Sequence, residues 1–297
     1  MTLSTTTRPT RDRGRVTTLT ALPDLLLEPL VRAALEEDLG RAGDLTSTAV
    51  IPADDEAAFR ITARDHGTLA GLDLARLSFT LLDPRVRFTP LVPDGARVAP
   101  GEAVARVDGT ARSLLSAERV ALNFLGHLSG VATATATIAD AIAHTTTRVC
   151  CTRKTTPGLR TVEKYAVRAG GGVNHRFGLD DAILVKDNHI AVAGSVTEAV
   201  RRVRQSLPHL VAVEVEVDSL AQLEELLEHP VDAVLLDNMS PETTAEAVRM
   251  VAGRMVTEAS GRITAQTAPA LAEAGVDLVS AGWITHSAPV LDLGLDA

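Results

Sequence analysis

The second half of the chain alternates between short apolar runs and longer amphipathic segments. The apolar runs are five to seven residues long and rich in valine, leucine and isoleucine, which is typical of buried strands. They are RVCCT at 148–152, AILVK at 182–186, VAVEVEV at 211–217, VDAVLLD at 231–237, RMVTE at 254–258 and VDLVSAG at 276–282. Six strands separated by segments of helical length predict parallel pairing, because parallel neighbours need long crossover connections.

Most of the intervening segments have the pattern of helices. In the segment 195–207 the apolar residues recur with the 3.6-residue period of one helix face. Four helix starts are indicated by N-cap residues, two of them followed by proline at the first helical position. These starts are Ser195 with Glu198, Ser219 with Gln222, Ser240-Pro241 and Thr156-Pro157.

The pattern predicts an α/β fold, an incomplete TIM-like α/β barrel, in which a seventh strand lies near 170–175. An open, doubly wound sheet is the alternative. No GxGxxG motif opens a helix after the first strand, which disfavours a dinucleotide-binding fold.

The first 125 residues follow a different pattern and predict a second domain. A helix is expected near 23–39, and strand-like runs with turns follow it. The stretch 94–109 resembles a lipoyl or biotinyl carrier but lacks the hairpin lysine, so we interpret it as part of a hammerhead-like α+β open sandwich. A long helix at 113–144, broken near 126–130, is expected to bridge the domains. We predict a disordered arm at 1–22, the sandwich at 23–125 joined by the tail 287–297, and the barrel at 126–286.

Composition narrows the class of protein. The 297 residues are 45% hydrophobic and carry a net charge of −9, which disfavours nucleic-acid binding. No apolar run reaches the roughly 20 residues that cross a membrane, and the first residues lack the apolar core of a secretory signal. The two cysteines, Cys150 and Cys151, are adjacent. We interpret them as reduced, buried residues of a cytoplasmic protein.

Positive charge is distributed unevenly. The chain has 26 arginines but only three lysines, and Lys154, Lys164 and Lys186 all fall within 33 residues. Between 148 and 186, eight basic residues face three acidic ones. A basic region in an acidic protein predicts a small anionic ligand, although Lys164 could equally be a surface residue.

The carboxyl ends of the predicted strands carry the candidate chemistry, since ligands of parallel α/β folds bind there. Cations follow the early strands, carboxylates the middle ones, and small residues the last two. The cations are Arg153, Lys154, His175, Arg176 and Lys186; the carboxylates are Glu216 and Asp237; the small residues are Ser260, Gly261, Ala281 and Gly282. Glu214 could belong to a solvated edge, and His189 is favoured as a packing residue. This arrangement suits a ligand with several anionic groups and a ribose.

Several stretches of the chain resemble the quinolinate phosphoribosyltransferase family. They cover the chain from about residue 30 to its end, and TRKTTPGLR with GGGVNHR is specific enough to indicate the family. The stretches are EEDLGRAGDLTSTAVIP (36–52), SAERVALNFLGHLSGVAT (116–133), TRKTTPGLRTVEKYAVRAGGGVNHRFGLDDAILVKDNH (152–189), EVEVDSL (214–220), LLDN (235–238), EASG (258–261) and GWITHS (282–287).

The resemblance implies a reaction and a set of roles. Quinolinate and phosphoribosyl pyrophosphate would give nicotinate mononucleotide, pyrophosphate and CO₂, with Mg²⁺ as cofactor, in NAD biosynthesis. By position, the quinolinate carboxylates would be held by Arg119 of a neighbouring subunit in a homodimer, with Arg153, His175 and Arg176. Lys154 and Lys186 would contact the phosphoribosyl donor and the substrate, Glu216 and Asp237 the ribose and Mg²⁺, and Ser260, Gly261 and Gly282 the 5′-phosphate.

Other functions remain open at this stage. A related type II phosphoribosyltransferase could use another acceptor, such as nicotinate. Lys186 could form a Schiff base in an aldolase, or the stretch 94–109 could be a carrier or interaction module. Cys151 and Trp283 depart from the family pattern, but neither replaces a proposed ligand of the substrate.

Overall fold

The structure, a computed structural model, describes residues 19–206 and 208–297. These residues form two compact units that interleave along the chain. The barrel unit comprises 137–154 and 173–282, and the sandwich unit comprises 19–136, 155–172 and 283–297. The predicted barrel range 126–286 includes residues 155–172, which belong to the sandwich unit here. The predicted domain boundaries, 23–125 and 126–286, stay a prediction. The predicted arm at 1–22 lies almost wholly outside the described residues.

The barrel unit is built on a parallel sheet of six strands in the order β6-β11-β10-β9-β8-β7. The strands are β6 (Arg148–Cys150), β7 (Ile183–Val185), β8 (Val213–Val217), β9 (Ala233–Asp237), β10 (Val256–Ser260) and β11 (Leu278–Ser280). Val173 forms a parallel bridge to Cys150 on β6, so the seventh strand expected near 170–175 is present as a single bridge. The α/β barrel prediction is confirmed.

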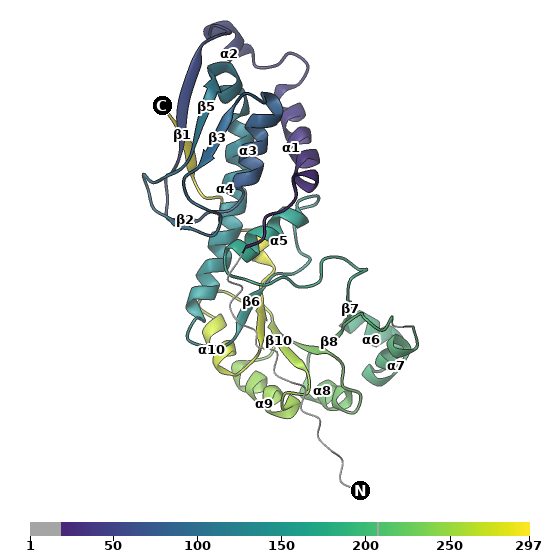
Figure 1. The fold of residues 1–297 in the computed structure, drawn as a ribbon. Helices are drawn as coiled ribbons and strands as arrows, with labels where there is room; N and C mark the ends of the chain where they lie inside the picture. Colours follow the sequence, from purple (N-terminus) through teal and green to yellow (C-terminus); the bar gives the residue numbers. More distant parts are fainter. Residues whose placement is uncertain (1–18, 207) are drawn as a thin grey trace. The chain divides into compact units, whose positions relative to one another are not determined.

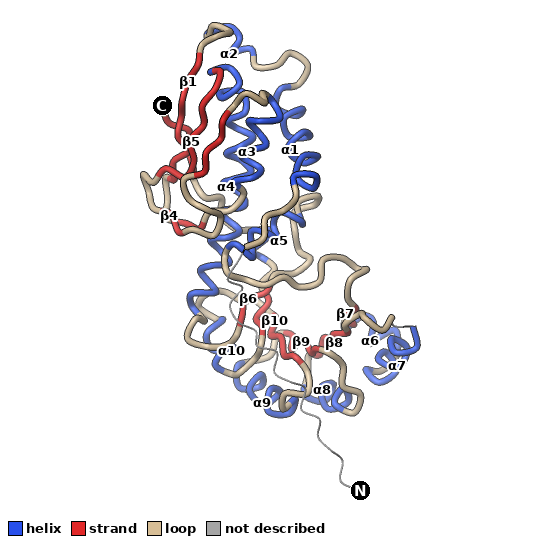
Figure 2. Tube along the Cα trace, viewed as in Figure 1, coloured by secondary structure: helices blue, strands red, loops and turns tan. Residues whose placement is uncertain are grey.

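Helices connect the strands of this unit. They are α6 (Asp187–Ala193), α7 (Val196–Ser206), α8 (Leu220–Leu227), α9 (Pro241–Val251) and α10 (Ala268–Glu273). Figure 2 shows the strands as a curved row with α8, α9 and α10 along one side. Three predicted N-caps are confirmed, because the hydroxyls of Ser195, Ser219 and Ser240 each accept a backbone N–H three residues later.

The sandwich unit has an antiparallel sheet in the order β12-β1-β5-β3 and a small ribbon, β2-β4. Its strands are β1 (Glu56–Ala63), β2 (Gly67–Thr68), β3 (Arg87–Pro90), β4 (Arg97–Val98), β5 (Ala103–Thr110) and β12 (Leu293–Asp296), and its shorter helices are α1 (Asp24–Leu39), α2 (Leu45–Val50), α3 (Leu72–Leu82), α5 (Arg160–Ala169) and α11 (Trp283–His286). Figure 1 shows α1 beside α3. Ile61 of β1 and Phe79 of α3 are fully buried in one core, which fits the predicted open sandwich.

The long helix α4 (Ala111–Ala141) is continuous, so the predicted break near 126–130 is wrong. Its glycines serve close packing instead. A Cβ on Gly126 would lie 2.9 Å from the carbonyl oxygen of Leu291, and one on Gly130 would lie 2.1 Å from that of Pro289. The C-terminal tail therefore packs directly on the backbone of α4, where a side chain would exclude it.

Two further local predictions are wrong. Thr156-Pro157 does not begin a helix; α5 begins at Arg160, because Gly158 has a φ of 82°, which an α-helix cannot include. The strand predicted at 254–258 is shifted to Val256–Ser260. The side chain of Arg254 instead donates to the carbonyls of Met250 and Val251 at the end of α9. As a result Glu258 lies in the middle of a strand.

Among the helices in the described part of the chain, none combines the length and apolarity needed to cross a bilayer.

Candidate active site

Strand register places the candidate residues of the barrel unit on one face of its sheet. Asp237 of β9 is the partner of Ser260 on β10, and Ser260 is the partner of Ser280 on β11. Leu235 pairs with Glu216 on one side and with Glu258 on the other. Register partners in a parallel sheet project to the same face. The predicted carboxylates and small residues therefore line one surface near the carboxyl edge.

A lysine–glutamate pair lies at the ends of β7 and β8. Lys186 Nζ is 2.6 Å from Glu216 Oε2, and the glutamate side chain is only 13% exposed. Lys186 directly follows β7, and its backbone N–H donates to Nδ1 of His189. His189 is exposed and orients the start of α6 through this hydrogen bond, so the packing role expected for it is not what the structure has. The pair offers both a cation and a carboxylate to a ligand.

Asp237 is held by two neighbours at the end of β9. Its Oδ1 accepts the hydroxyl of Ser260 at 2.9 Å, and its Oδ2 accepts the amide of Asn238 at 2.6 Å. These bonds fix the orientation of the carboxylate before any ligand arrives.

Two glycines at the ends of the last strands lie close against neighbouring side chains. Gly261 has a φ of 112°, and a Cβ there would lie 2.4 Å from Oδ1 of Asn238. A Cβ on Gly282 would lie 2.8 Å from Cδ of Lys154. Both positions therefore present backbone rather than side chains, as a phosphate cradle requires.

The cationic side of the site is crowded. Partial burial, and then the neighbouring guanidinium of Arg153, lower the pKa of Arg176. Nη1 of Arg176 donates to the carbonyl of Ala182 at 3.0 Å. Its buried Nε has no hydrogen-bond partner among the described residues. Two close arginines, one with an unsatisfied donor, are the environment that an anionic ligand stabilises.

Comparison with known proteins identifies the family. The chain matches "Quinolinate phosphoribosyl transferase, N-terminal domain" over residues 44–129 and the C-terminal domain of the same family over 131–296. The chain belongs to the quinolinate phosphoribosyltransferase family.

Individual relatives agree with this assignment. The chain is 42% identical over 272 residues to the "Probable nicotinate-nucleotide pyrophosphorylase [carboxylating]" of Bacillus subtilis, covering 92% of this chain and 93% of that one. It is 44% identical over 273 residues to the "Nicotinate-nucleotide pyrophosphorylase [carboxylating]" of Mycobacterium leprae, covering 90% and 95%. The crystal structure of NadC from Streptococcus pyogenes superposes with a TM-score of 0.91 at 44% identity, covering 94% of this chain and 98% of that one.

These findings confirm the family and the transferase class predicted for this quinolinate phosphoribosyltransferase. The individual roles of the site residues stay predictions. Arg153, Lys154, His175, Arg176, Lys186, Glu216, Asp237, Ser260, Gly261 and Gly282 all lie in the barrel unit. Arg119 lies on α4 in the sandwich unit and is exposed. Lys164 is 1% exposed, so it is not the ordinary surface lysine that the sequence allowed.

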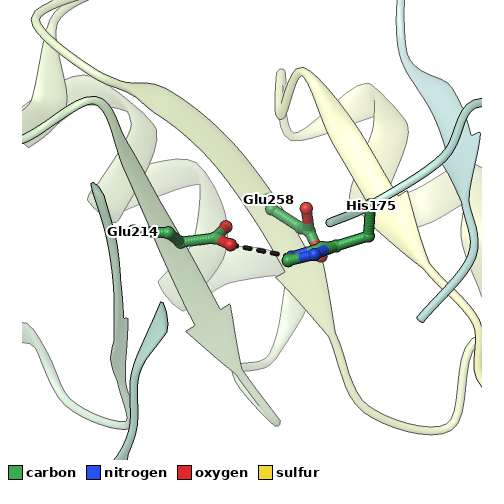
Figure 3. Close-up of side chains that lie close together, drawn as sticks. All are labelled: His175, Glu214 and Glu258. Carbon is green, nitrogen blue, oxygen red and sulfur yellow. Dashed lines mark hydrogen bonds and ion pairs between the residues drawn. The ribbon is translucent and has the colours of Figure 1, made fainter. Parts of the chain in front are cut away.

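In this quinolinate phosphoribosyltransferase, Glu214 and Glu258, for which no role was predicted, lie beside His175, which was predicted to bind the substrate. Nε2 of His175 is 2.8 Å from Oε2 of Glu214 and 3.9 Å from Oε1 of Glu258. Figure 3 shows the three side chains close together. Both glutamates are buried. In the sequence, both are glutamates among the apolar residues of a strand. Burying a carboxylate costs free energy unless it is paired, so this pattern could have indicated functional residues.

The opposite edge of the sheet also has hollows, but they do not match the predicted chemistry. One is lined by Val213, Asp232, Arg204 and Arg254 near the amino ends of β8 and β9. Arg204 donates to the carbonyl of Pro230, and Arg254 to those at the end of α9. These arginines are committed to the backbone, which indicates a structural role.

Proposed function

We propose that the chain transfers the phosphoribosyl group of phosphoribosyl pyrophosphate to quinolinate. The acceptor loses its 2-carboxylate, and the products are nicotinate mononucleotide, pyrophosphate and CO₂, a step of de novo NAD biosynthesis. The observation that carries this proposal is the sign pattern on one face of the barrel sheet. Arg153 and the partly unsatisfied Arg176 are neighbours, and the Lys186–Glu216 pair lies at the ends of β7 and β8.

The cationic side fits the acceptor. Quinolinate is a dicarboxylate, and arginine binds carboxylates through paired N–H groups. Arg153 and Arg176 would hold the two carboxylates, and His175, whose two ring nitrogens are hydrogen-bonded to the backbone N–H of Arg176 and to Glu214, would fix the position of Arg176. Arg119 would join them from a partner subunit, so a homodimer is the smallest complete enzyme; its exposed position on α4 is compatible with this role.

The carboxylate side fits the donor. Glu216 and Asp237 would accept the ribose hydroxyls, while Lys154 and Lys186 would neutralise phosphate charge. The hydroxyl of Ser260 and the backbone N–H groups of Gly261 and Gly282, where a side chain has no room, would receive the 5′-phosphate.

The same carboxylates fit Mg²⁺. Glu216 and Asp237 offer the hard oxygen ligands that this ion prefers, and they project to one face of the sheet. One oxygen of Glu216 already pairs with Lys186, and both oxygens of Asp237 accept hydrogen bonds. The two residues would therefore hold the ion largely through water or donor oxygens. Bound Mg²⁺ would neutralise charge on the departing pyrophosphate.

The protein residues act mainly by position and charge. As the pyrophosphate leaves, positive charge develops on the ribose, and the carboxylates of Glu216 and Asp237 stabilise it. Lys154 and Lys186 stabilise the leaving group. Loss of CO₂ leaves an electron pair on the pyridine ring, which the quaternised ring nitrogen stabilises until the ring carbon takes a proton from water to give nicotinate mononucleotide. No covalent bond to the protein is required.

The proposal is tested by comparing quinolinate with nicotinate as the acceptor substrate. With phosphoribosyl pyrophosphate and Mg²⁺, quinolinate should support release of both pyrophosphate and CO₂, and nicotinate should not support turnover. Arg153→Lys keeps the charge but loses the paired geometry, so KM for quinolinate should rise by roughly 5- to 100-fold, or about 1–3 kcal/mol, with little change for the donor. Turnover of nicotinate alone would move the chain to a related transferase with another acceptor.

A second test addresses the dimer. Arg119→Ala and Lys154→Ala subunits should each be inactive alone. Mixed dimers should recover part of the activity, since one of their two sites contains both native residues. Verified mixed dimers without activity would contradict the shared site.

A further inference from the structure

Three ionisable side chains from separate segments meet inside the barrel unit. His175 follows the Val173 bridge, Glu214 lies on β8, and Glu258 lies on β10. Figure 3 shows both carboxyl groups turned toward the imidazole. One ligand atom from each residue lies within 4.8 Å of those of the other two. We call this set the buried triad.

Hydrogen bonding fixes the protonation of the imidazole. The backbone N–H of Arg176 donates to Nδ1 of His175 at 2.7 Å, so Nδ1 carries a lone pair and Nε2 carries the hydrogen. Nε2 donates to Glu214 at 2.8 Å. A metal would need the lone pair of Nε2, so this geometry disfavours a metal site. A second proton, on Nδ1, would face the N–H of Arg176.

The imidazole cannot satisfy both glutamates. It has one N–H on the side of the triad, and Glu214 accepts it. Oε1 of Glu258 is buried and has no hydrogen-bond partner among the described residues. Glu258 is 2% exposed. A buried carboxylate with an unsatisfied oxygen costs far more free energy when it is ionised than when it is a neutral carboxylic acid.

The surroundings of Glu258 also favour its neutral form. Burial raises the pKa of Glu258 to about 7, and the negative charge of Glu214 adds to the effect. His175 and a hydrogen bond from Ser280 act in the opposite direction, and the thiol of Cys151 raises the value slightly further. The register partners of Glu258 on β9 and β11 are Leu235 and Leu278, which contribute no charge.

We propose that Glu258 is a positioning residue that acts as a neutral carboxylic acid behind His175. It leaves Glu214 as the sole acceptor of the imidazole N–H, and it limits the triad to one negative charge. The inference rests on the proposed binding of a dicarboxylate by Arg153 and Arg176, next to His175. Ionised Glu258 would place a second negative charge beside the residues that must bind a dianion.

This arrangement predicts a pH-dependent affinity for the acceptor. As pH rises through about 7, Glu258 loses its proton and the cationic side of the site weakens. KM for quinolinate should rise by about tenfold between pH 6 and pH 8.5, because one added charge nearby costs on the order of a factor of ten. KM for the donor, which binds the other side, should change much less.

Glu258→Gln is the decisive variant, since the amide imitates the neutral acid. It should keep kcat at pH 6 and abolish the rise in quinolinate KM. Glu163→Gln is the matched control: Glu163 is also buried and lies 2.9 Å from a histidine, His127, but in the sandwich unit. That control should retain the wild-type pH profile.

A second measurement does not depend on activity. The wild-type protein should show the infrared C=O band of a buried carboxylic acid at pH 6, and the band should fade by pH 8.5. Glu258→Asp should shift the band and Glu258→Gln should remove it. If Glu258→Gln does not fold, the wild-type and Asp spectra still decide.

Two results would overturn the inference: a Glu258→Gln enzyme whose quinolinate KM still rises with pH as in the wild type, or a wild-type protein without the band at pH 6. The proposed function fails separately. If Arg153→Lys leaves quinolinate KM unchanged, the assignment of the acceptor site is wrong, whatever Glu258 does.

Discussion

Within residues 19–206 and 208–297, two histidines pair with buried glutamates, and the two pairs differ in how completely their hydrogen-bonding groups are satisfied. In the sandwich unit, Glu163 accepts His127 with one oxygen at 2.9 Å and the N–H of Thr156 with the other at 3.0 Å. In the barrel unit, Glu214 accepts His175, but Glu258 lies beside the pair with an unsatisfied oxygen. The first pair is complete without a ligand and stabilises a loop. Beside the second pair, the oxygen of Glu258 can still accept a hydrogen bond, and unsatisfied buried groups of this kind are typical of functional sites.

The largest expected effect concerns the arginine next to the second pair. Arg176→Met should lower kcat/KM for quinolinate by about 1,000-fold, or ~4 kcal/mol, because a charged contact to a carboxylate is lost. The free energy of unfolding should fall by only about 1 kcal/mol, the cost of losing the hydrogen bond from Nη1 of Arg176 to the carbonyl of Ala182, since the buried Nε has no partner among the described residues. Steady-state kinetics and urea unfolding together test this.

Arg204→Met provides the control for that experiment. Arg204 donates to the carbonyl of Pro230 at the other edge of the sheet, so its loss should lower stability and leave kcat/KM unchanged. If Arg176→Met lowers stability while activity survives, the contrast between satisfied and unsatisfied groups would be wrong for the barrel unit.

The next largest expected effect is on the pH dependence of the free energy of unfolding. The pKa of Glu258 is raised from 4.5 to about 7, so the folded state binds the extra proton between these values. The stabilisation that protonated Glu258 gives the folded state is fully present below about pH 4.5 and is lost as the pH rises through about 7. Relative to Glu258→Gln, the wild type should therefore lose roughly 2–3 kcal/mol of unfolding free energy between pH 5 and pH 8. Chemical denaturation of both proteins at each pH measures the difference, and a constant difference would contradict it.

The smallest effect concerns the satisfied pair. Glu163→Gln replaces a carboxylate that accepts two hydrogen bonds with an amide that has one acceptor oxygen, so the N–H of Thr156 or the imidazole loses its partner. The expected cost is about 1–2 kcal/mol of unfolding free energy. Calorimetry at pH 7 checks this value. A change in the pH profile of catalysis rather than in stability would mean that the two pairs are functionally alike.

The sequence allowed much of the barrel to be predicted, because its strands are short apolar runs and its candidate residues follow them directly. Lys186 and Asp237 are examples, each identified as the polar residue at a strand end. Glu258 received no role because the strand was placed two residues early, and only the contacts of Arg254 with α9 fix its true start. The glycines of α4 were interpreted as a helix break, since the tail that packs on them is about 160 residues distant. Such long-range contacts leave no local signal.

The pairing of β12 with β1 has a consequence for biosynthesis. Residues 293–296 complete a sheet whose other strands are synthesised within the first 110 residues. The edge of β1 therefore stays uncovered while the whole barrel unit is being synthesised. Most of the sandwich sheet is made first, but the sheet is expected to reach its final form only after the barrel sequence has been translated.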